Sequence, residues 1–360
     1  MKISVNSTFS YIKFNVNYGS VLQCYALQKY LKKRGHNVTL LRDYRANPVP
    51  LLKRLKYVKT GSLFFKKLNC LAKLQKFIKK NISLSERGYI SYKQLVDHCP
   101  SADCHIVGSD QIWHDAKNFR YLTYVPDDKL KLSYAASFGM SQINDQMKNA
   151  ITPYLIRFKG IAVREDSGVK IINDMGYDAV HVLDPTLLLN YQEYPYVQNM
   201  KSKIGGKYIY GYFLNLNSRE DIHYKSIKSY AEEKGIPIYF TVPLNYDLFS
   251  EDKGVLFPSV EEWLGLYHDA ECIFTNTYHG LLFCIIFKKE FVFFYNSQSQ
   301  GIERFTSILL RLGLEERMVS DDIDNKINTL LNEKINYDEV YRKIHEWRKV
   351  TDKYFESMSI

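Results

Sequence analysis

The sequence predicts an α/β protein built on parallel sheets, and three observations lead to that prediction. A strand, a polar loop, a helix and a second strand follow one another in the first 45 residues, which is a βαβ unit. The stretch Ile273 to Tyr295 repeats the order strand, turn, helix, strand. Polar residues come directly after several β-like runs between these two ends. The chain of 360 residues is long enough for two domains of ordinary size.

The first βαβ unit begins with a strand within Met1 to Phe14 and a polar, glycine-containing loop at residues 15–20. An amphipathic helix is expected from Val21 to Lys33, because apolar residues recur along one side of it, and Gly35 ends it. Val38 to Leu41 is the next strand. The loop lies at the carboxyl end of the first strand, where such sheets bind ligands. Its glycines do not match a dinucleotide fingerprint, so NAD is not expected.

Four more β-like runs follow in the first half of the chain, and each ends in polar residues. The runs are Cys104–Val107, Lys131–Ser137, Gly160–Val163 and Val180–Leu183. Asp110, Arg164 and Asp184 come shortly after three of them. Because the carboxyl ends of parallel strands meet at one edge of a sheet, we expect these side chains to lie along that edge.

A polar segment with Pro195 and Gly205-Gly206 suits an interdomain linker, and a second α/β unit follows it. The unit has strands at Lys207–Leu214 and Ile236–Val242 and helices at Ser218–Lys234 and Ser259–Asp269. Late helices are expected at Arg304–Leu312 and Glu339–Tyr354.

The stretch Ile273 to Tyr295 is where we expect chemistry. Residues 275–277, T-N-T, are good helix N-caps, and an apolar helix follows from about Tyr278 to Phe287. His279 and Gly280 fall in its first turn, where backbone N–H groups and the helix dipole favour an anion. A titratable side chain beside an anion site is a candidate proton-transfer group. The alternative is that His279 is only a polar cap over a core helix.

The net charge of +10 is concentrated in one window, since no acidic residue lies between Asp43 and Glu86. The basic residues there are Arg45, Lys53, Arg54, Lys56, Lys59, Lys66, Lys67, Lys73, Lys76, Lys79 and Lys80. Apolar residues are interleaved at roughly helical spacing, which predicts a helix with a core face. Its basic face is either solvated or docks on anionic lipid or an anionic acceptor. Nothing in the sequence is typical of nucleic-acid binding.

The composition also indicates the cellular compartment in which the protein is expected. No run of 18 apolar residues and no signal peptide is found, so neither a transmembrane helix nor secretion is expected. The six cysteines contain no C-x-x-C pair, and several lie in apolar runs. This pattern favours free buried thiols in a reducing, cytoplasmic compartment and argues against zinc or another metal.

Taken together, these segments resemble the polysaccharide pyruvyl transferase family. The matching stretches, in the order in which the family has them, are N-Y-G-S-V-L-Q-C-Y-A-L-Q (17–28), V-G-S-D-Q-I-W (107–113), S-Y-A-A-S-F-G (133–139), V-R-E-D-S-G (163–168), V-L-D-P-T-L-L (182–188) and T-N-T-Y-H-G (275–280). Each stretch alone is weak evidence for the family, but six stretches in the family's order are a fairly specific match.

The resemblance implies a fold like that of GT-B glycosyltransferases, with two Rossmann-like domains facing a cleft. Residues 1–200 would form the acceptor-side domain, with a basic helical segment at about 45–85. Residues 207–335 would form the second domain, which carries the His279 helix, and residues 336–360 a C-terminal helix. The implied donor is phosphoenolpyruvate, with no further cofactor, and the implied acceptor is a sugar or lipid-linked glycan. The product would be a pyruvate ketal of the kind found in capsules and exopolysaccharides.

The resemblance also implies roles for individual residues. The histidine of the family falls on His279 and one donor-binding arginine on Arg164. Family members tend to have a second arginine two residues before the histidine, where this chain has Thr277. Arg304 or Arg317 could compensate for that missing charge. Thr277, Gly280 and Arg304 are therefore expected beside the donor.

The chemistry needs cations for the donor and oxygen acceptors for the sugar. Arg164 offers a bidentate fork to a carboxylate or phosphate, although a surface ion pair with Glu165 or Asp166 would equally explain it. The residues expected to contact acceptor hydroxyl groups are Asn17, Tyr18, Gly19, Asp110, Gln111 and Asp184. The alternative for Asp184, which precedes Pro185, is that it caps a turn.

Two other functions fit the same residues. A GT-B glycosyltransferase that uses a nucleotide sugar would share the fold and the anion site. A non-catalytic scaffold in a polysaccharide assembly complex, with the basic segment as its docking surface, would explain the departure at Thr277. For the enzyme, we expect the basic window to give peripheral contact with the inner face of the membrane.

Overall fold

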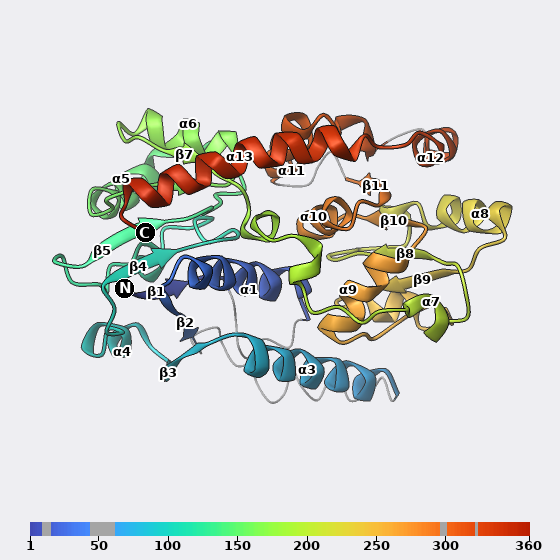
Figure 1. Cartoon of the computed structure of the whole chain (residues 1–360), viewed down its shortest axis with the longest axis horizontal. Coiled ribbons are helices and arrows are strands. Elements are labelled where there is room, and N and C mark those ends of the chain that lie inside the picture. Colours follow the sequence, from blue (N-terminus) through green and yellow to red (C-terminus); the bar gives the residue numbers. More distant parts are fainter. Residues whose placement is uncertain (9–15, 44–61, 296–300, 321–322) are drawn as a thin grey trace.

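Two parallel sheets, each flanked by helices, form the protein in a computed structural model (Figure 1). The structure describes residues 1–8, 16–43, 62–295, 301–320 and 323–360. The basic residues at positions 45–59 therefore lie outside the described residues. Among the described helices, none is both long and apolar enough to cross a bilayer.

The first sheet has the order β3-β2-β1-β4-β5, and all of its strands are parallel. Its strands are β1 (Lys2–Asn6), β2 (Asn37–Asp43), β3 (Leu84–Tyr89), β4 (Cys104–Val107) and β5 (Leu130–Ser133). Val5 at the centre pairs in register with Leu40 and Ile106 on its two neighbours. A short pair, β6 (Ala162–Val163) and β7 (Val180–His181), continues the sheet beyond β5 through single bridges.

The helices of this half are α1 (Tyr18–Lys33), α3 (Ser62–Asn81), α4 (Tyr92–Asp97), α5 (Asp145–Leu155) and α6 (Asp166–Asp174). Helix α1 begins three residues before the predicted start, because the side chain of Asn17 accepts a hydrogen bond from the Ser20 N–H and caps it. The edge strand β3 is missing from the prediction, since its sequence L-S-E-R-G-Y has no clear apolar alternation.

The second sheet has the order β12-β11-β10-β8-β9 and is also parallel. Its strands are β8 (Ile209–Tyr212), β9 (Ile238–Thr241), β10 (Cys272–Thr275), β11 (Glu290–Phe294) and β12 (Met318–Val319). Its helices are α7 (Met200–Lys203), α8 (Tyr224–Lys234), α9 (Val260–Asp269), α10 (Tyr278–Ile286), α11 (Glu303–Leu312) and α12 (Ile323–Asn332). The predicted parallel α/β fold with two sheets is confirmed.

The last helix, α13 (Tyr337–Ser357), runs from the second half back across the first (Figure 1). Trp347 donates its indole N–H to the His181 carbonyl at 2.9 Å, and Tyr354 donates its hydroxyl to the Ser133 carbonyl at 2.7 Å. Both side chains are buried, and nearer the start of α13 the Tyr341 hydroxyl donates to the Ile286 carbonyl of the second half at 3.0 Å, so α13 connects the two halves.

The two halves also meet through α1, which packs against α10 and α3. Tyr18 stacks on Trp263 of α9 with ring centroids 5.1 Å apart, and its hydroxyl donates to the Pro258 carbonyl at 2.8 Å. Tyr18 is therefore part of the core between the halves, and its hydroxyl is already bonded within the protein.

Helix α3 is amphipathic, as predicted for this part of the basic segment. Cys70, Leu74, Phe77 and Ile78 are buried along one face, and the helix contacts both α1 and α9. Lys66, Lys76, Lys79 and Lys80 are exposed. The six cysteines are all free thiols, and five of them are buried, as expected.

Candidate functional site

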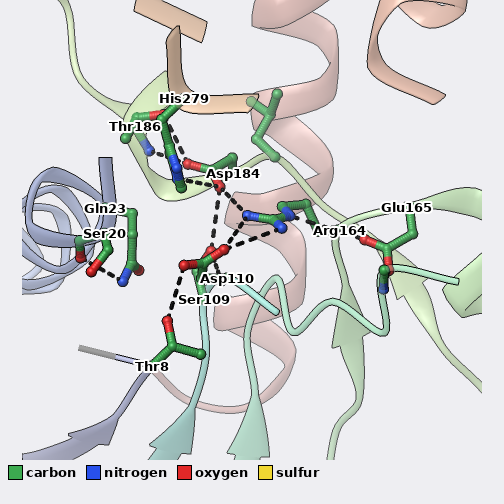
Figure 2. A network of polar contacts seen from close by, with 12 residues as sticks. Thr8, Ser20, Gln23, Ser109, Asp110, Arg164, Glu165, Asp184, Thr186 and His279 are labelled. Carbon is green, nitrogen blue, oxygen red and sulfur yellow. Dashed lines mark hydrogen bonds and ion pairs between the residues drawn. The ribbon is translucent and has the colours of Figure 1, made fainter. Parts of the chain in front are cut away.

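The candidate site lies where the carboxyl ends of strands in the first half face the first turn of α10 in the second half (Figure 2). Asp110 follows β4, Arg164 follows β6 and Asp184 follows β7, while His279 is the second residue of α10. The prediction that these strand ends bring the three charged residues together is confirmed, since Arg164 forms ion pairs with both carboxylates.

Arg164 is the centre of this network, and its side chain is fully buried. One guanidinium nitrogen donates to Asp184 Oδ2 at 3.1 Å, and two approach Asp110 Oδ1 at 3.5 Å. The guanidinium also lies over the Tyr278 ring, 4.2 Å from its centroid. Burial acts to lower the pKa of Arg164, but Tyr278, Asp110 and Asp184 outweigh it and raise that pKa, so the charge is permanent. The ion pair with Glu165 that was considered from the sequence is present, with Arg164 Nε 4.0 Å from Glu165 Oε2, but it is buried and not on the surface.

Asp184 is buried, with 1% of its surface exposed, and both of its oxygens have partners. Oδ1 accepts from the Thr186 N–H at 3.0 Å and from the Thr186 hydroxyl at 2.8 Å, which confirms the predicted turn cap. Oδ2 accepts from the Ser109 hydroxyl at 3.3 Å and from Arg164. Burial acts to raise the pKa of Asp184, but His279 and Arg164 lower it far below its usual range. Its carboxylate points into the protein, so it is not accessible to a sugar acceptor in solution.

Asp110 is the more open carboxylate of the pair, with 18% of its side chain exposed. Its φ of 71° is in the left-handed region, an uncommon backbone conformation for a residue other than glycine. The Thr8 hydroxyl donates to its Oδ2 at 3.0 Å. Burial acts to raise the pKa of Asp110, but the charges of Arg164, His279 and Arg304 lower it, so the carboxylate is ionised at neutral pH.

His279 is held between the two halves of the molecule. Its Nε2 lies 3.6 Å from Asp184 Oδ2 and is buried without a hydrogen bond among the described residues. On the other side, Gly19 of α1 is in such close contact that a Cβ there would lie 2.3 Å from His279 Cβ and 2.5 Å from Nδ1. Gly19, expected beside the acceptor, therefore makes room for the imidazole.

Thr277 and Gly280 build the N-terminus of α10. The Thr277 hydroxyl oxygen accepts from the Gly280 N–H at 2.9 Å. A Cβ at residue 280 would lie 2.2 Å from the Thr275 hydroxyl oxygen, so only glycine fits. These groups are occupied by capping, which leaves the N–H groups of Tyr278 and His279 as the first-turn donors that could reach an anion.

Arg304 lies close to the network at the start of α11. Burial and the positive charge of Arg164 lower its pKa, while Asp110 and Glu165 act in the opposite direction. No ion pair of Arg304 is found among the described residues, and its Nε has no hydrogen bond there. Gln111 lies nearby, since a Cβ on Gly301 would be 3.5 Å from Arg304 Nε and 3.6 Å from Gln111 Nε2.

Arg317, the other candidate for the missing charge, has a different place. It pairs with Glu290 at 3.0 Å and donates to the carbonyls of Leu330 and Glu333, both at 2.6 Å. It stabilises the turn before β12, away from His279, so it does not supply the missing charge.

Sequence reasoning missed three residues of the site: Ser109, Tyr278 and Gln23. Gln23 is buried, its amide nitrogen donates to the Ser7 hydroxyl at 2.8 Å, and its oxygen is unpaired among the described residues. All three lie within the family motifs quoted above. Their position inside a motif, together with their polar groups, was the signal that could have identified them. No group of three metal-ligating side chains occurs in the described part of the chain.

We expect Gly19→Ala to reduce the free energy of unfolding by about 1–3 kcal/mol, the usual range for overpacking. The added methyl must displace either the His279 ring or the start of α1. Denaturant unfolding measures the loss, and Ser20→Ala, one residue further along the helix, is the matched control. Equal stability of the two variants would show that residue 19 has room for a side chain.

Comparison with solved structures identifies the fold on which this site is built. The structure is similar to UDP-GlcNAc 2-epimerase from Neisseria meningitidis bound to UDP-GlcNAc, with a TM-score of 0.54 and 10% identity over 96% of this chain and 94% of that one. It is also similar to MnaA from S. aureus with UDP, with a TM-score of 0.52 and 10% identity over 95% and 90% of the two chains. A third similar structure, UDP-GlcNAc 2-epimerase from Methanocaldococcus jannaschii with UDP-GlcNAc and UDP, has a TM-score of 0.52 and 12% identity over 97% and 100%. These are GT-B-type folds, so the predicted fold is confirmed.

A search of the curated proteins found no match. The family model for polysaccharide pyruvyl transferase matches residues 17–298, which include Gly19, Asp110, Arg164, Asp184 and His279. The chain therefore belongs to the polysaccharide pyruvyl transferase family.

Proposed function

We propose that this protein transfers the pyruvate unit of phosphoenolpyruvate to a sugar of a capsular or exopolysaccharide precursor, as a ketal. The observation that carries the proposal is that His279 lies close enough to Asp110, an ionised and partly open carboxylate, to act on its pKa, in a chain of this family. One proton donor and one proton acceptor are what the reaction needs.

The proposed reaction balances as follows. A proton adds to the methylene carbon of phosphoenolpyruvate, which becomes a methyl group and leaves C2 electrophilic. Two sugar hydroxyl oxygens form bonds to C2, and the bond from C2 to the phosphate oxygen breaks. Of the two hydroxyl protons, one replaces the proton given to the methylene carbon and the other leaves with inorganic phosphate.

We assign the proton given to the methylene carbon to His279 and the proton taken from the attacking hydroxyl to Asp110. Asp110 suits the second role, because it is ionised at neutral pH and already accepts one hydroxyl, that of Thr8. His279 suits the first role, because it lies in the first turn of α10, beside the backbone N–H groups that would hold the donor.

The donor would be held chiefly by Arg304 and the first-turn N–H groups of α10. Arg164 is paired with three carboxylates, those of Asp110, Glu165 and Asp184, so its contribution is a fixed positive charge beneath the site. Arg304 has no carboxylate partner among the described residues, which leaves its fork for the donor carboxylate or phosphate. In this way Arg304 takes over the charge that Thr277 does not provide.

A glycosyltransferase that uses a nucleotide sugar remains the second candidate, because the similar structures from Neisseria and Methanocaldococcus hold UDP-GlcNAc. Protection in a thermal melt distinguishes the two candidates: phosphoenolpyruvate should raise Tm, and UDP sugars should not. A protein without catalysis would give no product with any donor.

We expect wild-type protein, incubated with phosphoenolpyruvate and a panel of lipid-linked glycans, to form a product that carries one pyruvate ketal, detected by mass spectrometry. His279→Ala should lower the rate by about 10²–10⁴-fold, the usual contribution of a positioned acid or base. His345→Ala, an exposed histidine on α13, is the control. Product from a UDP sugar instead, or an undiminished rate in folded His279→Ala protein, would contradict the assignment.

We expect Arg304→Ala to raise the KM for phosphoenolpyruvate with little effect on the KM for the acceptor. Losing one charged hydrogen bond of about 1.5–3 kcal/mol corresponds to roughly 10- to 150-fold. Arg304→Lys should recover part of the loss, because it keeps the charge without the fork. Arg342→Ala, in a surface pair on α13, is the control. A rise confined to the acceptor KM would assign Arg304 to the acceptor.

We further propose that the exposed lysines of α3 hold the enzyme against anionic lipid, at the inner membrane face where lipid-linked glycans are presented. The helix is packed through its apolar face, so its lysines point away from the core. Each Lys near an anionic surface contributes about 1 kcal/mol, and salt screens that attraction.

We expect the protein to float with anionic vesicles at low salt and not with neutral ones. The charge reversal of Lys66, Lys76, Lys79 and Lys80 to Glu should release it without changing turnover of a soluble acceptor. Reversal of four exposed lysines elsewhere, Lys93, Lys159, Lys170 and Lys253, controls for total charge. If the control set releases the protein equally, the attraction is not specific to α3.

A further inference from the structure

We propose that Asp184 is the positioning residue of His279, and that its negative charge orients the imidazole for proton transfer. This inference rests on the proposed function, since it gives Asp184 a part in the same reaction. It replaces the acceptor-binding role predicted for Asp184 from the sequence.

The two residues come from different halves of the chain. Asp184 lies between β7 and the 3-10 turn Pro185–Leu188, while His279 begins α10 of the second sheet. Their side chains converge between the halves, as Figure 2 shows, and a network of polar contacts surrounds Asp184 there. His279 therefore receives its charged partner from the opposite half of the molecule.

Groups other than His279 hold the Asp184 carboxylate in place. Thr186 holds Oδ1 through two hydrogen bonds, and Ser109 and Arg164 hold Oδ2. These contacts leave the carboxylate little freedom to turn, and because it is buried it cannot reach a substrate in solution. A carboxylate held in this way can orient an imidazole, which is how an aspartate acts on a histidine in hydrolases.

The distance between the partners is also informative. At 3.6 Å, His279 Nε2 is within ion-pair range of Asp184 Oδ2 but beyond a hydrogen bond. An approach of less than about 1 Å would give a charge-assisted hydrogen bond of about 2.7–2.9 Å. Gly19 on the opposite side prevents the ring from moving away, since there is no space between the helix α1 and the His279 side chain.

Charged groups of both signs surround His279. They are Asp110, Arg164 and Asp184 from the first half and Arg304 of α11, which acts on Asp110 and Tyr278. Among the described residues, Asp184 is the carboxylate that lies within ion-pair range of the imidazole. Asp184 is therefore the group placed to orient the ring for proton transfer.

The variant Asp184→Asn isolates the charge from the turn cap. An asparagine oxygen can still accept from the Thr186 N–H, so the turn is kept, while the negative charge beside His279 is lost. We expect kcat to fall by about 10²-fold or more with the donor KM nearly unchanged. The limb of the pH profile that requires protonated His279 should move to lower pH, because the proton is held less strongly.

Thr186→Val is the matched control, since it removes the hydroxyl bond to Oδ1 and leaves the carboxylate charge. It should lower stability and leave the pH profile in place. NMR titration of the His279 ring, assigned by comparison with His279→Gln, provides a readout that needs no reaction. A His279 titration in Asp184→Asn that matches wild type, or an equal displacement in Thr186→Val, would overturn the proposal. A His279 titration that is shifted in Asp184→Asn but not in Thr186→Val supports the proposal, even if phosphoenolpyruvate is not the donor.

Discussion

The buried ion pairs of Arg164 with Asp110 and Asp184 are the interaction on which the rest of the site depends. Two carboxylates at this depth would be strongly unfavourable without a cation, and a buried guanidinium would be unfavourable without them. Each charge follows a different strand, β4, β6 or β7, so the network requires the ends of these three strands to lie together.

The two halves contribute different kinds of group. The first half supplies fixed charges: a guanidinium whose proton is never lost and carboxylates whose pKa values are lowered. The second half supplies the titratable imidazole and the first turn of α10. Tyr278 joins the two sets, because its ring belongs to α10 and lies against the guanidinium of Arg164. The site is thus an interface in which charged groups of the first half surround an imidazole of the second half.

Much of this could be predicted from the sequence, and the successes share a cause. The strand ends at Asp110, Arg164 and Asp184 were predicted to meet, because the carboxyl ends of parallel strands share an edge whatever the details of packing. The helix start at His279 was predicted for a similar local reason, since T-N-T before an apolar run is a strong capping signal.

The features that the sequence did not predict depend mostly on contacts between distant parts of the chain. Residue spacing could not show that Tyr18 stacks on Trp263, that Arg164 is buried rather than on the surface, or that Asp184 faces His279. Each of these facts joins segments that are far apart in the chain, and only the packing of one half on the other determines them. The short edge strand β3 was missed for the opposite reason, because its local pattern carries too little apolar signal.

Gly19 and His279 behave as one steric unit, although they are 260 positions apart in the sequence. Any side chain at position 19 occupies the volume of the imidazole, so the two positions cannot vary independently. Their substitution energies should therefore be non-additive, since a smaller residue at 279 would relieve the crowding that a larger residue at 19 creates. For protein engineering, this means that position 19 can accept a side chain only if the imidazole opposite it or the start of α1 moves.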